Sequence, residues 1–336
     1  MALTIQERLK DLRVECGLTL EQLAEQTHLS KSALGSYEAD DFKDISHYAL
    51  IKLAKFYGVT ADYLLGLTEI RKHKIEVEVK IKMVELHGKA PYKAVLIHGG
   101  PGAIGSLKNC AEELSRLTER GIVEALQSQY SIAGLIEELY LQIMKYCQEK
   151  PTLIGHSWGA WLAVLFAGKY PKICKNIILV GCPPLTDKYV KEISLRRLRN
   201  LSDEESKIFQ RMIDNVATDE DIKKIPSILE KSDNYYLESS GKLIVDKADN
   251  EMYNRIWNEA TKLRTNGALL TAFKNIQSKL FLIQGEYDPH PIEGVIKPLE
   301  ENGIPCENYI LEKCGHSPFM EKYAKEKFYD ILQAII

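Results

Sequence analysis

Apolar side chains recur every three to four positions along the first seventy residues, which is the spacing of amphipathic helices. The positions concerned include Leu9, Leu12, Leu20, Leu23 and Ala24. Gly17 separates the first helix from the second. The hydroxyl side chains of Ser30 and Thr60 suit the N-caps of two further helices, expected over 31–38 and from residue 61 onward. The pattern predicts a small all-helical domain over residues 1–70.

A different pattern follows a linker that we place at residues 71–74. Between residues 75 and 83 apolar and charged side chains alternate, which predicts a strand with one solvated face near a sheet edge. Short apolar runs then alternate with helical segments. Strands are expected at 94–97, 121–126, 152–154, 177–180, 280–283 and 309–311, and helices near 105–118, 132–148, 158–169, 292–302 and 320–335. This alternation predicts an α/β domain over residues 75–336, with a mostly parallel sheet covered on both faces.

The alternation of strands and helices is interrupted between about residues 184 and 275. This stretch is charged and mostly helix-like. We expect it to be an insertion that forms a helical cap on the α/β domain.

Composition narrows the class of protein. The chain has 336 residues, 45% of them hydrophobic, and a net charge of −3. It contains no window of about 18 uncharged apolar residues and no basic start followed by an apolar core, so neither a membrane span nor a secretory signal is expected. The seven cysteines form no C-x-x-C pair, which argues against a disulfide framework and a zinc site. We therefore expect a reduced, cytoplasmic protein without a metal or other cofactor and without membrane partners.

Residues 155–159, Gly-His-Ser-Trp-Gly, fit the pattern G-x-S-x-G. The pattern carries chemical meaning only where a strand precedes it and a helix follows, and both are expected here. Glycines two positions either side of Ser157 permit a tight turn that lifts the serine hydroxyl above the sheet, at a helix N-terminus that favours negative charge. Ser157 is therefore the candidate nucleophile.

A serine hydroxyl needs a base to take its proton and an acid to orient that base. Asp288 follows the strand expected at 280–283, and His316 follows the strand expected at 309–311. Because parallel strands end at one edge of a sheet, these two side chains are expected to meet Ser157 there. Glu286 is an alternative acid and His290 an alternative base.

Residues 98–102, His-Gly-Gly-Pro-Gly, directly follow the strand expected at 94–97. Glycines allow backbone N–H groups to approach a substrate closely, as stabilisation of an oxyanion requires. We expect the N–H groups of Gly100 and Trp158 to form the oxyanion hole. The loop that carries the first of them consists of His98, Gly99, Gly100, Pro101 and Gly102. A loop that only connects two elements remains an alternative interpretation of residues 98–102. A phosphate-binding loop is disfavoured because no Gly-Lys-Ser/Thr follows.

Taken together, residues 75–336 resemble the α/β-hydrolase family, and residues 98–102 resemble its prolyl iminopeptidase-like subgroup. The resemblance implies a serine hydrolase with Ser157, Asp288 and His316 as the triad. The subgroup's members remove N-terminal residues from peptides. The chain departs from the subgroup at residues 126–131, where an Asp-x-Arg-Gly-x-Gly stretch is absent, and at His156, where glycine is common. Peptidase and esterase activity therefore both remain open, with an ester, amide or short peptide as substrate.

Residues 17–38, together with 50–66, resemble the Cro/C1-type helix-turn-helix family. The resemblance implies that the helix near 31–38 enters the major groove of DNA, with Lys31, Ser32 and Ser36 facing the DNA, and it allows a homodimer. Leu20 stands where the family often has glutamine, and residues 39–44 are acidic. Residues 1–70 carry seven basic and eleven acidic side chains, so they lack the positive charge of a dedicated DNA binder. A helical domain used only for dimerisation therefore remains an alternative.

Two functions are consistent with these features. The first is a serine hydrolase that acts through an acyl-enzyme and carries an N-terminal DNA-binding domain. The second is a transcription regulator whose hydrolase-like domain senses a small molecule with little or no turnover. The complete set of nucleophile, base, acid and oxyanion loop favours the first function, whereas the fusion to a helix-turn-helix domain favours the second.

Overall fold

The computed structural model of the protein describes residues 3–39, 45–69, 71, 84–214, 216–238 and 247–336. The chain divides into two compact units, Met1–Ile81 and Lys82–Ile336. The strand expected at 75–83 and most of the expected linker lie outside the described residues.

Every element assigned in the described residues of the first unit is a helix. Its helices are α1 (Ile5–Glu15), α2 (Leu20–Thr27), α3 (Lys31–Tyr37), α4 (His47–Tyr57) and α5 (Ala61–Leu64). The hydroxyls of Ser30 and Thr60 cap α3 and α5, as predicted, by accepting hydrogen bonds from the N–H groups three residues later. Leu9, Leu23 and Leu34 are fully buried and join the three helices α1, α2 and α3 in one small core.

In its described residues, the second unit is built on a seven-stranded sheet. Its strands are β1 (Val84–His87), β2 (Tyr92–Ile97), β4 (Gly121–Ala125), β5 (Thr152–His156), β6 (Asn176–Val180), β8 (Lys279–Gly285) and β9 (Glu307–Leu311). They lie in the order β1-β4-β2-β5-β6-β8-β9, with β1 antiparallel to β4 and all other neighbours parallel. The predicted parallel sheet is confirmed, and its antiparallel edge strand is β1.

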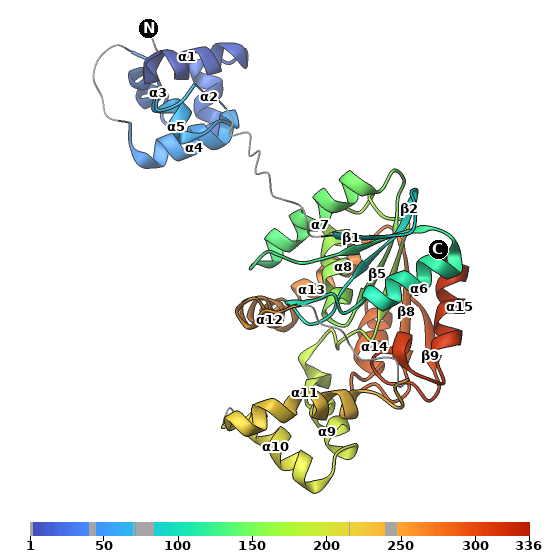
Figure 1. Ribbon diagram of the computed structural model, residues 1–336. Helices are drawn as coiled ribbons and strands as arrows, with labels where there is room; N and C mark the ends of the chain where they lie inside the picture. The colour runs from blue at the N-terminus through green and yellow to red at the C-terminus, as the bar shows by residue number, and fades with distance from the viewer. Residues whose placement is uncertain (1–2, 40–44, 70, 72–83, 215, 239–246) are drawn as a thin grey trace. The chain divides into compact units, whose positions relative to one another are not determined.

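Helices cover both faces of this sheet (Figure 1). One face carries α7 (Ile132–Tyr146), α8 (Trp158–Lys169) and α14 (Glu293–Glu301), and the other carries α6 (Lys108–Thr118) and α15 (Lys325–Ile335). Alternate residues of each strand face opposite cores: Val95 and Ile97 join the core beneath α8, whereas Leu96 joins the core beneath α6. The buried strands are consequently apolar on both faces, which is why they read as continuous apolar runs in the sequence.

The segment between β6 and β8 is mainly helical. It contains η1 (Asp187–Tyr189), α9 (Val190–Arg199), α10 (Asp203–Ile213), α11 (Asp219–Asp233), α12 (Asn250–Thr265) and α13 (Ala268–Lys274). Helices α9, α10 and α11 pack on one another as a layer separate from the sheet (Figure 1). By contrast, α12 and α13 bury Ile256 and Phe273 in the core beneath α8, so they belong to the body of the domain. A short ladder of β3 (Ala103–Ile104) with β7 (Lys247–Ala248), which no sequence pattern predicted, connects the segment to the loop after β2.

Within the described residues, no helix combines the length and the apolar character needed to cross a bilayer.

Candidate active site

Ser157 lies at the turn between β5 and α8. Its backbone has φ 55° and ψ −121°, a strained conformation for a residue other than glycine. The Ser157 N–H donates to the Val180 carbonyl at 2.8 Å, which ties the turn to the neighbouring strand β6. A Cβ on Gly155 would overlap the backbone of Gly159, and a Cβ on Gly159 would overlap the Ile97 carbonyl. Close packing at both glycine positions therefore explains the spacing of the motif.

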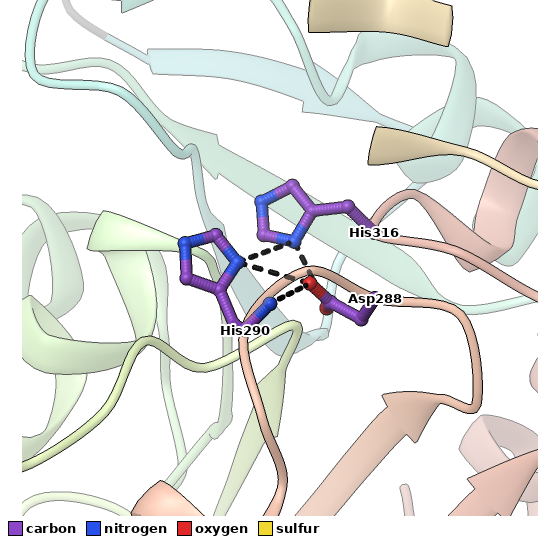
Figure 2. Close-up of side chains that lie close together, drawn as sticks. All are labelled: Asp288, His290 and His316. Carbon is purple, nitrogen blue, oxygen red and sulfur yellow. Dashed lines mark hydrogen bonds and ion pairs between the residues drawn. The ribbon is translucent and has the colours of Figure 1, made fainter. Parts of the chain in front are cut away.

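Asp288 and His316 meet at the carboxyl ends of the neighbouring strands β8 and β9. His316 Nδ1 lies 3.0 Å from Asp288 Oδ2 (Figure 2). Asp288 is fully buried, and its Oδ2 also accepts a hydrogen bond from the Gln284 amide at 2.8 Å. With Nδ1 donating to the carboxylate, His316 keeps Nε2 as its proton acceptor.

His290, the alternative base, shares the same carboxylate. Its Nδ1 lies 3.0 Å from Asp288 Oδ1, and its backbone N–H donates to that oxygen at 2.8 Å. The Nδ1 atoms of the two histidines are 3.3 Å apart, so the two imidazoles lie next to each other and both contact the Asp288 carboxylate (Figure 2). Glu286, the alternative acid, has no such contact among the described residues.

Burial and the contacts between Asp288 and the two histidines shift the pKa values of these three side chains in opposite directions. Burial alone raises the pKa of Asp288, but the two adjacent imidazoles outweigh it and lower that pKa well below its usual range. Burial lowers the pKa of His290, whereas for His316 the attraction of Asp288 outweighs burial and raises the pKa. Of the two histidines, His316 is therefore better supported by Asp288 as a site for a proton.

The loop after β2 approaches the serine turn. A Cβ on Gly99 would lie 2.9 Å from the Ser157 Cβ, so only glycine fits beside the serine. Gly99, Gly100 and Pro101 line the same cavity as Ser157 and Trp158. Within the described residues, the N–H groups of Gly100 and Trp158 donate no backbone hydrogen bond. Both donors are thus available at the cavity wall.

The remaining two residues of this loop lie behind the cavity wall. His98 is fully buried, its Nδ1 lies 2.9 Å from the Gly99 carbonyl, and burial lowers its pKa to about 4. Gly102 packs against Asp249, whose N–H donates to the Gly102 carbonyl at 3.2 Å. Both residues therefore stabilise the conformation of the loop and do not face the cavity.

Gln127 connects the two segments that carry these donors, a role that the sequence analysis missed. Its side-chain amide donates to the His98 carbonyl at 3.0 Å and accepts a hydrogen bond from the Trp158 indole N–H at 3.0 Å. Gln127 lies just past the end of β4, at the same sheet edge as Ser157 and Asp288. A polar residue just past a strand end was the available signal, but residues 126–131 were read only as a departure from a family motif.

Two acidic residues connect the inserted helices to the His316 loop. The backbone carbonyl of Asp233, the last residue of α11, accepts a hydrogen bond from the His316 N–H at 2.7 Å. The fully buried Glu321 carboxylate accepts hydrogen bonds from the backbone N–H groups of Tyr235, Tyr236 and Gly315 at 2.7–2.8 Å. No sequence signal could have found the link to the inserted helices, because Tyr235 and Tyr236 lie about 85 residues from Glu321 and offer it only backbone atoms.

A cavity of about 650 Å³ opens between the sheet edge and the inserted helices. Ser157, His290 and His316 line it from the sheet side. The apolar part of the opposite wall includes Val190, Ile193, Leu229 and Trp257. Arg197 and Asp233 also reach the cavity and form a two-pronged ion pair with both distances at 2.7 Å. The site therefore presents a nucleophile candidate to a mainly apolar chamber.

The candidate DNA contacts lie in the first unit. Lys31 begins α3, its side chain is exposed and it pairs with Glu21. Ser32 is exposed, and the Ser36 hydroxyl donates to the Ser32 carbonyl at 2.9 Å. Leu20 packs against α3, with its Cδ1 at 3.7 Å from the position a Cβ would take on Gly35. Packing thus accounts for an apolar residue at a position where the family often has glutamine.

Among the residues that the structure describes, two clusters have the composition of a metal site. Asp288, His290 and His316 form the first cluster, and Glu85, His87 and Glu124 form the second. The hydrogen bonds within the first cluster account for the arrangement of its side chains. The second lies apart from the cavity.

Residues 115–323 match the family model described as alpha/beta hydrolase fold, and residues 9–64 match the model described as helix-turn-helix. The first match covers more than half of the chain, so the protein belongs to the alpha/beta hydrolase fold family. It carries a helix-turn-helix domain in its N-terminal region.

Solved structures share the fold at low sequence identity. VinJ is 16% identical with a TM-score of 0.57, over 74% of this chain and 92% of VinJ. The proline iminopeptidase of Mycobacterium smegmatis is 13% identical with a TM-score of 0.54, over 75% of this chain and 92% of that one. Est816, described as an N-acyl homoserine lactone degrading enzyme, is 12% identical with a TM-score of 0.50, over 75% and 96% of the two chains. At these identities the likeness concerns the fold alone.

The helix-turn-helix domain has curated relatives in Bacillus subtilis (strain 168). The uncharacterized HTH-type transcriptional regulator YobD is 44% identical over 70 residues, which are 21% of this chain and 62% of YobD. The HTH-type transcriptional regulator ImmR is 36% identical over 70 residues, which are 21% of this chain and 54% of ImmR. The match thus spans somewhat more than half the length of each regulator.

Proposed function

We propose that the protein is a serine hydrolase that cleaves an ester, an amide or a short peptide through an acyl-enzyme. The observation that carries this proposal is the 3.0 Å contact of His316 with the buried Asp288, beside a cavity that Ser157 also lines. Ser157 attacks the carbonyl carbon of the substrate, and His316 Nε2 takes the hydroxyl proton. His316 then returns the proton to the leaving group, and a water molecule hydrolyses the acyl-enzyme by the same route.

The N–H groups of Gly100 and Trp158 stabilise the oxyanion. Donors that are fixed before the reaction need no reorganisation when negative charge develops on the substrate oxygen. Ser157 lies at the N-terminus of α8, where the helix dipole adds to this effect. Within the described residues the Ser157 hydroxyl forms no hydrogen bond. The proposed reaction therefore requires that this hydroxyl contacts His316 once the substrate is bound, because catalytic hydrogen bonds often tighten only in the complex.

The chamber favours substrates with an apolar acyl group. Val190, Ile193, Leu229 and Trp257 provide apolar contacts. The carboxylate of Asp233 is occupied by Arg197, which leaves Glu230 as the other acidic side chain at the wall. Glu230 alone offers little to a peptide whose free N-terminal amino group would have to be held by two carboxylates. An ester or amide with an apolar acyl chain therefore fits this wall better than such a peptide.

A fluorophosphonate probe tests the nucleophile directly. We expect covalent labelling of the wild-type protein at Ser157 and none of Ser157→Ala. The same pair is assayed on short-chain nitrophenyl esters and on prolyl anilide, and the preferred substrate separates esterase from peptidase. Wild-type protein that neither labels nor turns over any of these compounds would refute the hydrolase and leave the small-molecule sensor.

We further propose that the helix-turn-helix domain binds DNA through α3. The positive charge available for phosphates is small, because Arg8 and Arg13 are engaged with Glu69 and Glu38 within the domain. Binding should therefore be weak and sensitive to salt. In a gel-shift assay with the DNA upstream of its own gene, Lys31→Ala should weaken binding and reduce the salt slope by about one. A wild-type domain that shows no shift at low salt would favour its use in dimerisation.

The sensor function rests on the presence of both domains in one chain. If the cavity controls DNA binding, a ligand that occupies it changes DNA affinity. The discriminating variant is Ser157→Ala, which keeps the cavity but abolishes turnover. A regulator that only senses its ligand responds to it equally in wild type and Ser157→Ala, whereas control that requires hydrolysis is lost in the variant.

A further inference from the structure

A second cluster of polar side chains lies at the edge of the sheet, away from the cavity. Strands β1 and β4 pair with Glu85 opposite Glu124 and with His87 opposite Ile122. Directly opposed residues of an antiparallel pair share a face, and so do residues two apart on one strand. Glu85, His87 and Glu124 therefore lie together on one face. It is the face beneath α6, because Ile122 belongs to that core.

These three side chains are gathered closely, and one pair among them has the separation of two ligands on a single ion. Their ligand atoms all lie within 4.8 Å of one another, and His87 Nε2 is 3.3 Å from Glu124 Oε2. Two ligand atoms about 2.0–2.1 Å from a tetrahedral zinc ion lie roughly 3.3–3.4 Å apart. The observed separation matches this value and is longer than the common N–H···O hydrogen bond of about 2.9 Å.

Glu124 is also incompletely satisfied. It is fully buried, and its Oε1 has no hydrogen-bond partner among the described residues. Like charges directly opposite each other on paired strands repel, and an unpaired buried carboxylate oxygen is costly. Lys108 Nζ is 3.6 Å from Glu85 Oε2, and Lys108 and Glu85 are both partly exposed. A divalent cation would neutralise both carboxylates at once and give Glu124 Oε1 a partner.

We propose that Glu85, His87 and Glu124 form a binding site for a divalent transition-metal ion of the Zn²⁺ type. An imidazole in the ligand set favours zinc and similar ions, since Mg²⁺ and Ca²⁺ prefer oxygen ligands alone. The ion joins the antiparallel edge strand β1 to β4, so its role is to hold β1 in the sheet. None of the three residues lines the cavity, and the site is independent of the proposed hydrolysis.

Metal binding can be measured without any activity assay. The full-length chain is freed of metal by a chelator, its exposed thiols are alkylated with iodoacetamide, and Zn²⁺ is titrated by calorimetry. We expect one Zn²⁺ per chain and a Tm that rises with Zn²⁺ concentration. Wild-type protein that takes up no stoichiometric Zn²⁺ would overturn the proposal.

Variants locate the site. Glu124→Gln keeps the size of the side chain but removes a charged ligand, and we expect at least about a tenfold loss of Zn²⁺ affinity. His87→Gln and the more exposed Glu85→Gln provide the same comparison if Glu124→Gln does not fold. His28→Asn is the control, because it removes an exposed imidazole at a left-handed position that asparagine tolerates. Folded ligand variants that bind Zn²⁺ as tightly as His28→Asn does would also overturn the proposal.

Discussion

The indole N–H of Trp158 donates a hydrogen bond to the side-chain oxygen of Gln127 at 3.0 Å, and the Gln127 amide donates in turn to the His98 carbonyl. One buried side chain thus joins the serine turn to the loop after β2. The two proposed oxyanion donors, Gly100 and Trp158, belong to the two segments that it joins. A small change in either segment alters the distance between the donors, so Gln127 is a positioning residue for the proposed reaction.

Gln127→Ala should lower kcat by about tenfold with little change in KM, because a loosened donor pair stabilises the transition state less than it binds the substrate. The measurement is ester hydrolysis by the purified variant. Gln129→Ala is the matched control, since Gln129 lies in the same segment and its side chain bonds to Ser128 and Glu138 rather than to the His98 loop. Equal losses in both variants would mean that Gln127 acts through the fold of the segment alone.

The two histidines on Asp288 should differ in their effect on turnover. We expect His316→Gln to lower kcat by about 10⁴-fold or more, because no other group takes the serine proton. His290→Gln should keep kcat within about tenfold of wild type, since it removes one hydrogen bond to Asp288 and leaves the base in place. The reverse order of the two losses would identify His290 as the base.

The pH dependence should report the attraction of Asp288 for His316. His316 must be neutral to accept a proton, so kcat/KM falls as the pH drops below the pKa of His316. Asp288 raises that pKa above its ordinary value of 6.5, which places the acid limb of the profile above pH 6.5. In Asp288→Asn the carboxylate no longer raises the pKa of His316, and burial alone lowers it, so the acid limb should move to lower pH. The same variant should lower kcat by about 10⁴-fold. An acid limb at unchanged pH in this variant would contradict the assignment.

The serine turn should tolerate no side chain at Gly159. A Cβ there would overlap the Ile97 carbonyl, which is backbone and cannot rotate away. We expect Gly159→Ala to lower the free energy of unfolding by at least about 3 kcal/mol, measured by urea denaturation. Gly303→Ala should cost only about 1 kcal/mol, because φ is +66° at Gly303 but nothing lies within 4 Å of an added Cβ. Similar losses in the two variants would show that the turn can relax.

The local pattern of the sequence determined the two kinds of domain and most element positions. Strand residues such as Leu96 and Ile97 are buried on opposite faces of the sheet, so the parallel strands appear as apolar runs in the sequence. The helix caps at Ser30 and Thr60 depend on backbone N–H groups only three positions away. The position of Asp288 and His316 just after strands predicted their meeting, because parallel strands share one carboxyl edge. The structure brings these two side chains to 3.0 Å.

Only the tertiary structure decided which distant side chains share a partner. His290 reaches the same carboxylate as His316, Gln127 joins two loops, and Glu321 binds backbone groups about 85 residues away. The antiparallel register that places Glu85 beside Glu124 is likewise a property of strand pairing. Periodicity records which face of an element is buried, but it carries no information on which buried polar atoms meet. That depends on the packing of whole elements against one another.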